Sequence, residues 1–172
     1  MSRTALVVID MINAYDFPDA EKVVPAAEEA VPVIEEAIEN HDGPVIYVND
    51  NFGHWRSHRD QLVAEALQGE HRDLVEPIKP EEDTAFVVKL RHSIFFETPL
   101  SYLLAENDIK RVVLIGQATE QCILYSALDA YIRHFDVRVP PDAVAHIHEN
   151  LADAALEMME RNMSVDLTPV RA

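Results

Sequence analysis

Short apolar runs alternate with helix-length segments along the whole chain, and this alternation constrains the fold more than any other feature. Each run is rich in β-branched and aliphatic residues and is followed by polar or glycine residues. Buried parallel strands have this composition because helices cover both faces of their sheet. We therefore predict a three-layer α/β fold with a mostly parallel sheet. The expected strands are residues 4–9, 45–48, 85–88, 112–115, 137–139 and 165–167.

Residues 25–40 carry apolar side chains at helical spacing with glutamates between them, which predicts an amphipathic helix. Further helices are expected within residues 61–74, 98–107, 119–134 and 151–163, the last of them capped by Asn150. The chain has 172 residues and neither repeats nor a low-complexity linker. We therefore expect one domain over residues 1–172.

The charge balance is strongly acidic: 31 Asp and Glu face 14 Lys and Arg, a formal net charge of −17. This argues against nucleic acid and anionic membranes as partners. An acidic, lysine-poor composition is similar to that of proteins from salt-loaded cytoplasm, so a halophilic source is one hypothesis. An ordinary acidic protein is the alternative, because charge alone identifies little.

Cys122 is the sole cysteine, which excludes an internal disulfide and suits a reducing compartment. The amino terminus runs directly into a predicted strand, and no apolar run is long enough to span a bilayer. We therefore expect a cytoplasmic protein. With four glycines in all, the chain has no glycine-rich phosphate loop, and no cofactor is implied.

Cys122 lies where a predicted central strand gives way to a helix. Gly116 permits a tight turn after the strand, Thr119 can cap the helix, and Glu120 suits its first turn. Open α/β sheets bind ligands at this edge. Free backbone N–H groups and the positive end of the helix dipole are both expected to favour the Cys122 thiolate.

Two other residues end predicted strands at the same edge. Asp10 follows residues 4–9, where burial would raise the pKa of its carboxyl group, although a simple capping aspartate would look the same. Lys89 follows residues 85–88. It either extends its ammonium group to solvent or lies buried near the thiol, where it would lower the thiol pKa.

The loop after residues 45–48 combines acidic, histidine and aromatic side chains. Asp50, His54 and His58 recur at intervals of four, so a metal site with His71 as a further ligand is conceivable. Gly53 weakens a helix there, and no metal motif supports the site, so pocket-lining or surface roles are the alternative. We predict no metal. Trp55 would either line a pocket or fill a gap beneath the loop.

Three segments in order, VVIDMIN at residues 7–13, KLRHSIFFETPL at 89–100 and GQATEQC at 116–122, resemble the isochorismatase-like cysteine hydrolases. The later ALDA at 127–130 and DA at 142–143 also resemble this family. The resemblance implies a Rossmann-like, six-stranded parallel sheet. It implies a catalytic triad at Asp10, Lys89 and Cys122. It also implies a cis peptide bond between Gln117 and Ala118, which directs the N–H groups of Ala118 and Cys122 to one point as an oxyanion hole.

The resemblance further implies hydrolysis of a small amide or carbamoyl compound through a Cys122 acyl-enzyme, with Asp10 as acid and base and Lys89 as electrostatic support. Family members that hydrolyse nicotinamide carry an Asp-x-His cluster, which the NDNFGHW segment at 49–55 does not match. Vinyl-ether hydrolases of the family need no cysteine. A redox sensor or a non-catalytic module are further alternatives. We expect a homo-oligomer that binds a small-molecule substrate in a pocket lined by Tyr15, Asp50, Phe52, Trp55 and Gln117.

Overall fold

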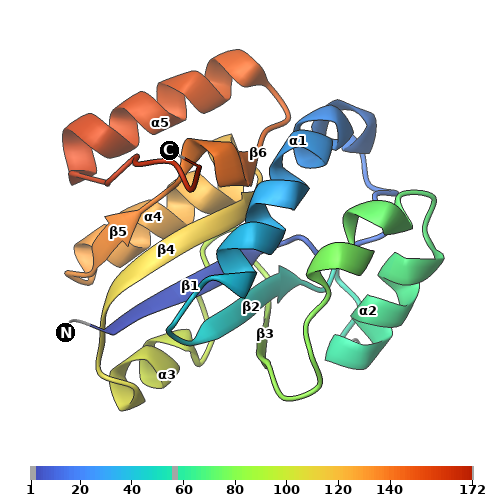
Figure 1. Ribbon diagram of the computed structural model, residues 1–172, viewed down its shortest axis with the longest axis horizontal. Coiled ribbons are helices and arrows are strands. Elements are labelled where there is room, and N and C mark those ends of the chain that lie inside the picture. Colours follow the sequence, from blue (N-terminus) through green and yellow to red (C-terminus); the bar gives the residue numbers. More distant parts are fainter. Residues whose placement is uncertain (1–2, 56–57, 172) are drawn as a thin grey trace.

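The computed structural model describes residues 3–55 and 58–171 and arranges them as a parallel sheet between helices (Figure 1). The strands are β1 (Arg3–Ile9), β2 (Val45–Asp50), β3 (Ala85–Lys89), β4 (Ile109–Gln117), β5 (Asp136–Arg138) and β6 (Val144–Ala145). The helices are α1 (Ala20–Glu39), α2 (Arg59–Gln68), α3 (Leu100–Glu106), α4 (Leu124–Ile132) and α5 (Glu149–Met163). A π-helical turn, Thr119–Ile123, leads into α4, and shorter helical turns lie at Arg72–Leu74, Glu76–Ile78 and Pro141–Ala143.

The sheet has six strands in the order β3-β2-β1-β4-β5, and β6 also pairs with β4. All of these pairs are parallel. β5 pairs with the beginning of β4 and β6 with its end, and β4 is the longest strand, with 9 residues. The predicted α/β class and the parallel sheet are therefore confirmed. β1 and β4 lie at the middle because their residues are apolar on both faces.

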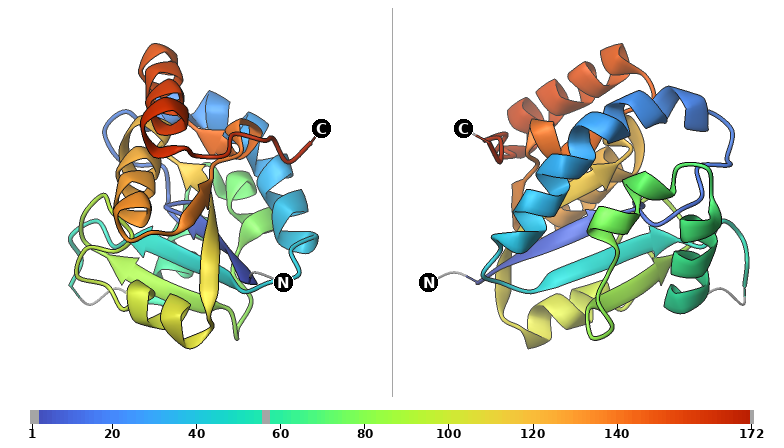
Figure 2. Two further views of the ribbon diagram at one scale, coloured as in Figure 1. Left: turned by 90° about the vertical axis from the view of Figure 1, so that its left-hand side faces the viewer. Right: turned by 45° about the vertical axis from the view of Figure 1, so that its right-hand side comes forward.

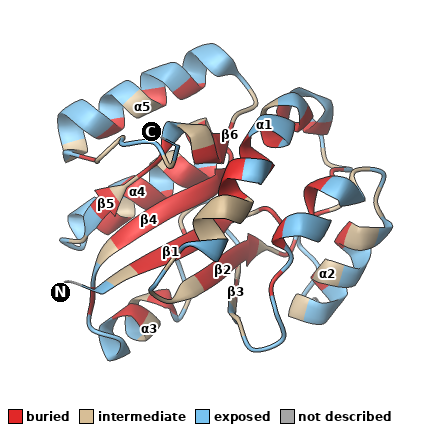
Figure 3. Cartoon of the chain, viewed as in Figure 1, coloured by how far each residue is buried: buried red, intermediate tan, exposed pale blue. Residues whose placement is uncertain are grey.

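Alternate side chains of β1 enter two separate cores, one on each face of the sheet. Ala5, Val7 and Ile9 pack in the core beneath α3, α4 and α5, whereas Leu6 and Val8 pack in the core beneath α1 and α2. Figure 2 shows these helix layers on either side of the sheet, and Figure 3 shows the buried central strands between them. Both faces of the sheet are therefore shielded from water, as its composition predicts.

The structure differs from the sequence prediction at the boundaries of two helices. α1 begins at Ala20 rather than Pro25, and Pro25 and Pro32 both lie inside it. Each proline removes one backbone hydrogen bond, but the buried side chains of the first turns offset that loss. α5 begins at Glu149, with His148 rather than Asn150 as its N-cap residue.

The sixth strand is Val144–Ala145, not residues 165–167 as the sequence suggests. Asp166 forms a single bridge to Arg138. The Asp166 carboxylate then accepts the backbone N–H of Thr168 at 2.9 Å, so the chain turns instead of extending as a strand. Among residues 3–55 and 58–171, no helix combines the length and the hydropathy that a membrane span requires.

Candidate active site

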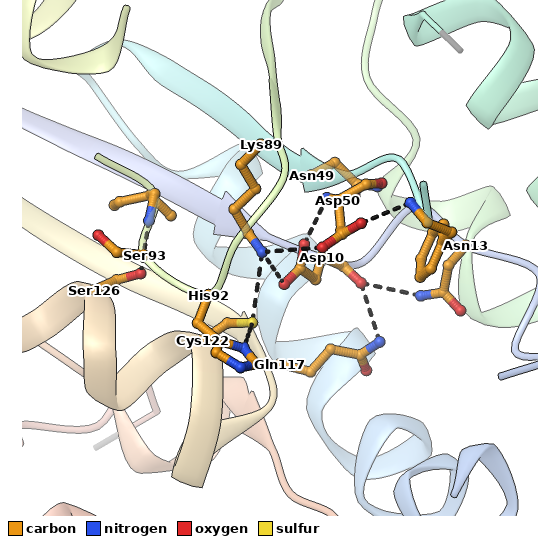
Figure 4. A network of polar contacts seen from close by, with 12 residues as sticks. Asp10, Asn13, Asn49, Asp50, Lys89, His92, Ser93, Gln117, Cys122 and Ser126 are labelled. Carbon is orange, nitrogen blue, oxygen red and sulfur yellow. Dashed lines mark hydrogen bonds and ion pairs between the residues drawn. The ribbon is translucent and has the colours of Figure 1, made fainter. Parts of the chain in front are cut away.

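Three strand ends bring Asp10, Lys89 and Cys122 together at one edge of the sheet (Figure 4). Asp10 directly follows β1, Lys89 is the last residue of β3, and Cys122 follows β4. Nζ of Lys89 lies 2.9 Å from Oδ2 of Asp10 and 3.5 Å from Sγ of Cys122. The carboxylate, the ammonium group and the sulfur therefore form one contiguous polar cluster.

The backbone and side chain of Asp10 are both held in place. Its φ is 55°, a left-handed conformation that aspartate tolerates better than most residues. Its Oδ1 accepts the backbone N–H of Asp50 at 2.8 Å. Its carbonyl oxygen accepts the side-chain amides of Asn13 and Gln117, each at 3.0 Å. These bonds leave Oδ2 directed at Lys89.

The Lys89 side chain has no exposed surface, which is unusual for a lysine. Burial on its own would lower the pKa of Lys89. Nearby acidic groups, Asp10 first among them, outweigh burial, and the pKa lies above the ordinary lysine value. A second carboxylate contributes, since Oδ2 of Asp50 lies 3.9 Å from Nζ. Lys89 therefore remains an ammonium group, and it does not extend to solvent.

Cys122 lies in the π-helical turn, which two side chains anchor to the segment around β6. Thr119 does not cap this turn as predicted: its hydroxyl donates to the carbonyl of Ala145 at 3.0 Å instead. Glu120 accepts the backbone N–H groups of Ile147 at 3.0 Å and His148 at 2.7 Å. Neighbouring chain segments, rather than a local cap, therefore position the turn that carries the sulfur.

The connection between β4 and this turn has two unusual backbone features. The Gln117–Ala118 peptide bond is cis, which confirms the expectation from the resemblance. Gly116 has a φ of +116°, and a Cβ atom there would lie 2.2 Å from the carbonyl oxygen of Ile9. Only glycine therefore permits β4 to pass so close to β1 at the edge that carries the site.

The protonation of Cys122 differs from the prediction. Burial raises the pKa of Cys122 most and the Asp10 carboxylate raises it further, whereas Lys89 lowers it by less. Because the ammonium charge is already balanced by Asp10, it leaves little excess positive potential for the sulfur. The pKa of Cys122 is therefore raised, which is opposite to the direction that a helix terminus and a nearby lysine suggested.

A cavity of about 230 Å³ opens onto this cluster. Of the side chains expected in a pocket, Asp50, Phe52 and Gln117 line it together with Asp10 and Cys122. Its remaining walls are Asn13, Phe17, Val23, His92, Ala118, Gln121 and Ile147.

Two predicted pocket residues lie elsewhere. Tyr15 is buried behind the wall, with its hydroxyl 3.4 Å from Oε1 of Gln117. Trp55 is 83% exposed and does not contact the cavity, because its loop points it outward. Tyr15 therefore contacts the cavity wall through Gln117, and Trp55 is not part of the wall.

Sequence reasoning missed His92, whose Nδ1 lies 3.6 Å from Sγ of Cys122. The signal was present, since His92 follows Lys89 at the same strand end. Two hydrogen bonds hold its segment against α4. Ser93 donates to Asp129 at 2.7 Å, and Ser126 accepts the backbone N–H of Ile94 at 3.1 Å.

The four residues considered as metal ligands have different surroundings. Asp50 faces Lys89, His54 and His58 are exposed, and the ring of His71 packs edge-on against Tyr15 at 5.9 Å. Within the part of the chain that the structure describes, no three His, Cys, Asp or Glu side chains are grouped as metal ligands.

Comparisons of the sequence with a family profile and with known proteins point to the same family. Residues 4–170 match the sequence profile of the isochorismatase domain. YaaI, an isochorismatase family protein of Bacillus subtilis, is 32% identical over 171 residues, which cover 95% of this chain and 92% of the relative.

Solved structures with the same fold include two amide-hydrolysing enzymes by name. The nicotinamidase of Staphylococcus aureus superposes with a TM-score of 0.74 at 26% identity, covering 97% of this chain and 99% of that one. The N-carbamoylsarcosine amidase of Thermoplasma acidophilum has a TM-score of 0.70 at 27% identity, with coverages of 99% and 98%.

Proposed function

This chain belongs to the isochorismatase family of hydrolases, and we propose that it hydrolyses the C–N bond of a small amide or carbamoyl compound through an acyl-enzyme on Cys122. The observation that carries the proposal is the position of the Cys122 sulfur, 3.5 Å from a buried ammonium group that is itself paired with Asp10. A nucleophile, a proton acceptor and a fixed cation are the groups that acyl transfer needs.

The first half of the reaction forms the acyl-enzyme. Sγ of Cys122 attacks the substrate carbonyl carbon, and its proton passes to the carboxylate of Asp10. The C–N bond then breaks, the amine leaves with the proton that Asp10 returns, and a thioester remains on the sulfur.

The second half releases the acid. Asp10 removes a proton from a water molecule, whose oxygen attacks the thioester carbonyl. The S–C bond breaks, and the proton held by Asp10 returns to the sulfur. Lys89 stays charged throughout, holding Asp10 in place and stabilising negative charge on Sγ.

The backbone N–H groups of Ala118 and Cys122 are assigned to the oxyanion of each tetrahedral intermediate. One such donor is typically worth about 3 kcal/mol of transition-state stabilisation.

A small substrate fits the cavity of about 230 Å³ better than a peptide would. The names of the two structural neighbours, a nicotinamidase and an N-carbamoylsarcosine amidase, support an amide or carbamoyl group as the reacting part. Vinyl-ether hydrolysis is the second candidate within the family. Vinyl-ether hydrolysis does not require a cysteine, whereas Cys122 lies within this polar cluster.

The test is ammonia release from a panel of small amides and carbamoyl compounds in concentrated salt, with wild type and Cys122→Ala compared side by side. Release by wild type and its loss in Cys122→Ala would support the proposal and name the substrate class. Equal release by both proteins, or none from any compound, would contradict amide hydrolysis through Cys122. An intact fold of Cys122→Ala is checked by urea unfolding.

A further inference from the structure

The Cys122 sulfur has a neighbour that the mechanism above leaves unused. Nδ1 of His92 lies 3.6 Å from Sγ, nearly the same distance as Nζ of Lys89 at 3.5 Å. Figure 4 shows both nitrogens directed at the sulfur, and His92 also lines the cavity. The sulfur is therefore contacted by nitrogen atoms of two basic side chains.

The two nitrogens differ in their access to water. The Lys89 side chain is fully buried and its charge is balanced by Asp10, whereas His92 is exposed. An exposed imidazole exchanges protons with solvent, and histidine is the side-chain type that can change its charge at physiological pH. His92 is therefore placed to add a positive charge at the sulfur that the buried pair does not already cancel.

The orientation of His92 is constrained from the side of α4. Its ring packs against Tyr125, with ring centroids 5.3 Å apart and planes at 41°. The next two residues are tied to α4 by the hydrogen bonds of Ser93 and Ile94. The short contact with Sγ is therefore supported by packing, as a reacting group requires.

Charged and titratable groups face His92 from several elements of the fold. Cys122 and Tyr125 face it from the π-helical turn and α4, and Asp10 and Asp50 share its cavity from the ends of β1 and β2. From its own segment come Lys89, paired with Asp10, and the exposed neighbour Arg91. Two carboxylates thus share the cavity with the imidazole.

We propose that His92 is a further catalytic residue, whose protonated imidazole donates Nδ1–H to Sγ and stabilises the Cys122 thiolate from the solvent side. The proton of the thiol goes to Asp10, and the imidazolium keeps its own proton, so no bond in His92 breaks. Once Asp10 is neutral, Lys89 and His92 together face a single negative charge. This inference rests on the proposed role of Cys122 as the nucleophile.

The experiment is alkylation of Cys122 by iodoacetamide across a range of pH, with wild type, His92→Phe and His92→Gln compared. Cys122 is the only cysteine, so the label reports one site, and Cys122→Ala gives the background. His92→Phe keeps an aromatic ring against Tyr125, and His92→Gln keeps a neutral N–H donor. Because His92 is exposed, both variants are expected to fold, which urea unfolding checks.

Near pH 6, wild type is expected to react about tenfold faster than either variant, because histidine is the side-chain type whose charge changes between about pH 5 and pH 8. Above about pH 8 the rates of wild type and the two variants should converge. A rate ratio that stays constant with pH would overturn the inference, as would wild-type behaviour of His92→Phe. Faster labelling of both variants at every pH would mean that His92 merely covers the sulfur, which also overturns it.

Alkylation needs no amide substrate, so its outcome is separate from that of the ammonia assay. Loss of the pH-dependent ratio with intact amide turnover would remove the role of His92 and leave the proposed function standing. The reverse result, a pH-dependent ratio without turnover of any amide, would leave the His92–thiolate contact and remove the proposed reaction.

Discussion

The ammonium group of Lys89 is paired with the carboxylate of Asp10 at 2.9 Å, and the Lys89 side chain is entirely excluded from solvent. The pair links two strands that are not neighbours, because β2 lies between β1 and β3. The two charges of the pair largely cancel. Burial therefore affects the pKa of the adjacent Cys122 thiol more strongly than the ammonium charge does. This relationship explains why the pKa of the Cys122 thiol is raised, and two predictions depend on it.

Asp10→Asn is expected to have opposite effects on two measurements. The Asp10 charge raises the pKa of Cys122, so its removal lowers that pKa and should accelerate iodoacetamide alkylation at neutral pH about tenfold. Amide hydrolysis should fall by about 10²- to 10⁴-fold, because the proton acceptor is lost. Parallel loss of both activities would mean that Asp10 serves only to hold the site together.

Lys89→Met is expected to destabilise the protein, because Asp10 keeps a largely buried charge without its partner. Removing one member of a buried ion pair costs about 3 to 5 kcal/mol of unfolding free energy, measurable by urea denaturation. Adding Asp10→Asn to Lys89→Met should recover part of this loss, since no charge is then left unpaired. A double variant as unstable as the sum of the two single variants would show that the residues are not coupled.

Stability should fall at alkaline pH because buried acidic groups resist ionisation in the folded state. Burial raises the pKa of Tyr47, as it does for Tyr15 and Cys122. Above about pH 10 the unfolded chain releases the tyrosine protons first and binds fewer protons than the folded state, so the unfolding free energy decreases as pH rises.

Tyr47→Phe tests this alkaline dependence. At neutral pH the variant should lose about 1 to 2 kcal/mol, because the Tyr47 hydroxyl donates to the buried carbonyl of Ile78 at 2.7 Å. Above about pH 10 the unfolding free energy of the variant should decline less steeply than that of wild type. If the unfolding free energies of the variant and wild type fell equally steeply with pH, Tyr47 would not contribute to the loss of stability at alkaline pH.

Gly116→Ala should destabilise the fold by about 3 kcal/mol or more, a loss in the range of severe backbone conflicts. The added Cβ would lie 2.2 Å from the Ile9 carbonyl oxygen, and the φ of +116° disfavours any side chain. Gly53→Ala is the matched control, since it also has a positive φ, of +80°, but has open space around it. Thermal unfolding measures the loss of stability in each variant. Gly53→Ala reports the cost of the positive φ alone, whereas Gly116→Ala adds the steric clash.

Salt should stabilise this protein if its acidic surface reflects a halophilic source. Raising KCl from about 0.1 M to about 1 M shortens the screening length from about 10 Å to about 3 Å, which weakens repulsion within a chain of net charge −17. We expect a gain on the order of 2 kcal/mol in unfolding free energy. The gain should shrink near pH 4.5, where many carboxylates are protonated, and full stability without salt would remove the hypothesis.

Sequence reasoning placed the three central residues at one edge of the sheet because of a topological rule, and the family resemblance implied that they form a triad. Asp10 and Lys89 each come directly after an apolar run, and Cys122 follows the run 112–115 after the connection 116–121. The carboxyl ends of parallel strands share one edge of a sheet. That inference needs no side-chain coordinates. The same rule applied to His92, which follows Lys89 in the chain, but nothing in the sequence marked its ring as turned towards the sulfur.

The sequence by itself determined the α/β class, the parallel sheet and the edge at which the polar residues gather, because these follow from local periodicity and strand ends. Tertiary structure alone decided the choice of β6, the bond from Thr119 to Ala145, the outward position of Trp55 and the protonation of the thiol. Each of these depends on groups distant in the chain. The pKa of Cys122 depends on the balance between burial, Asp10 and Lys89, and only the packed molecule sets that balance.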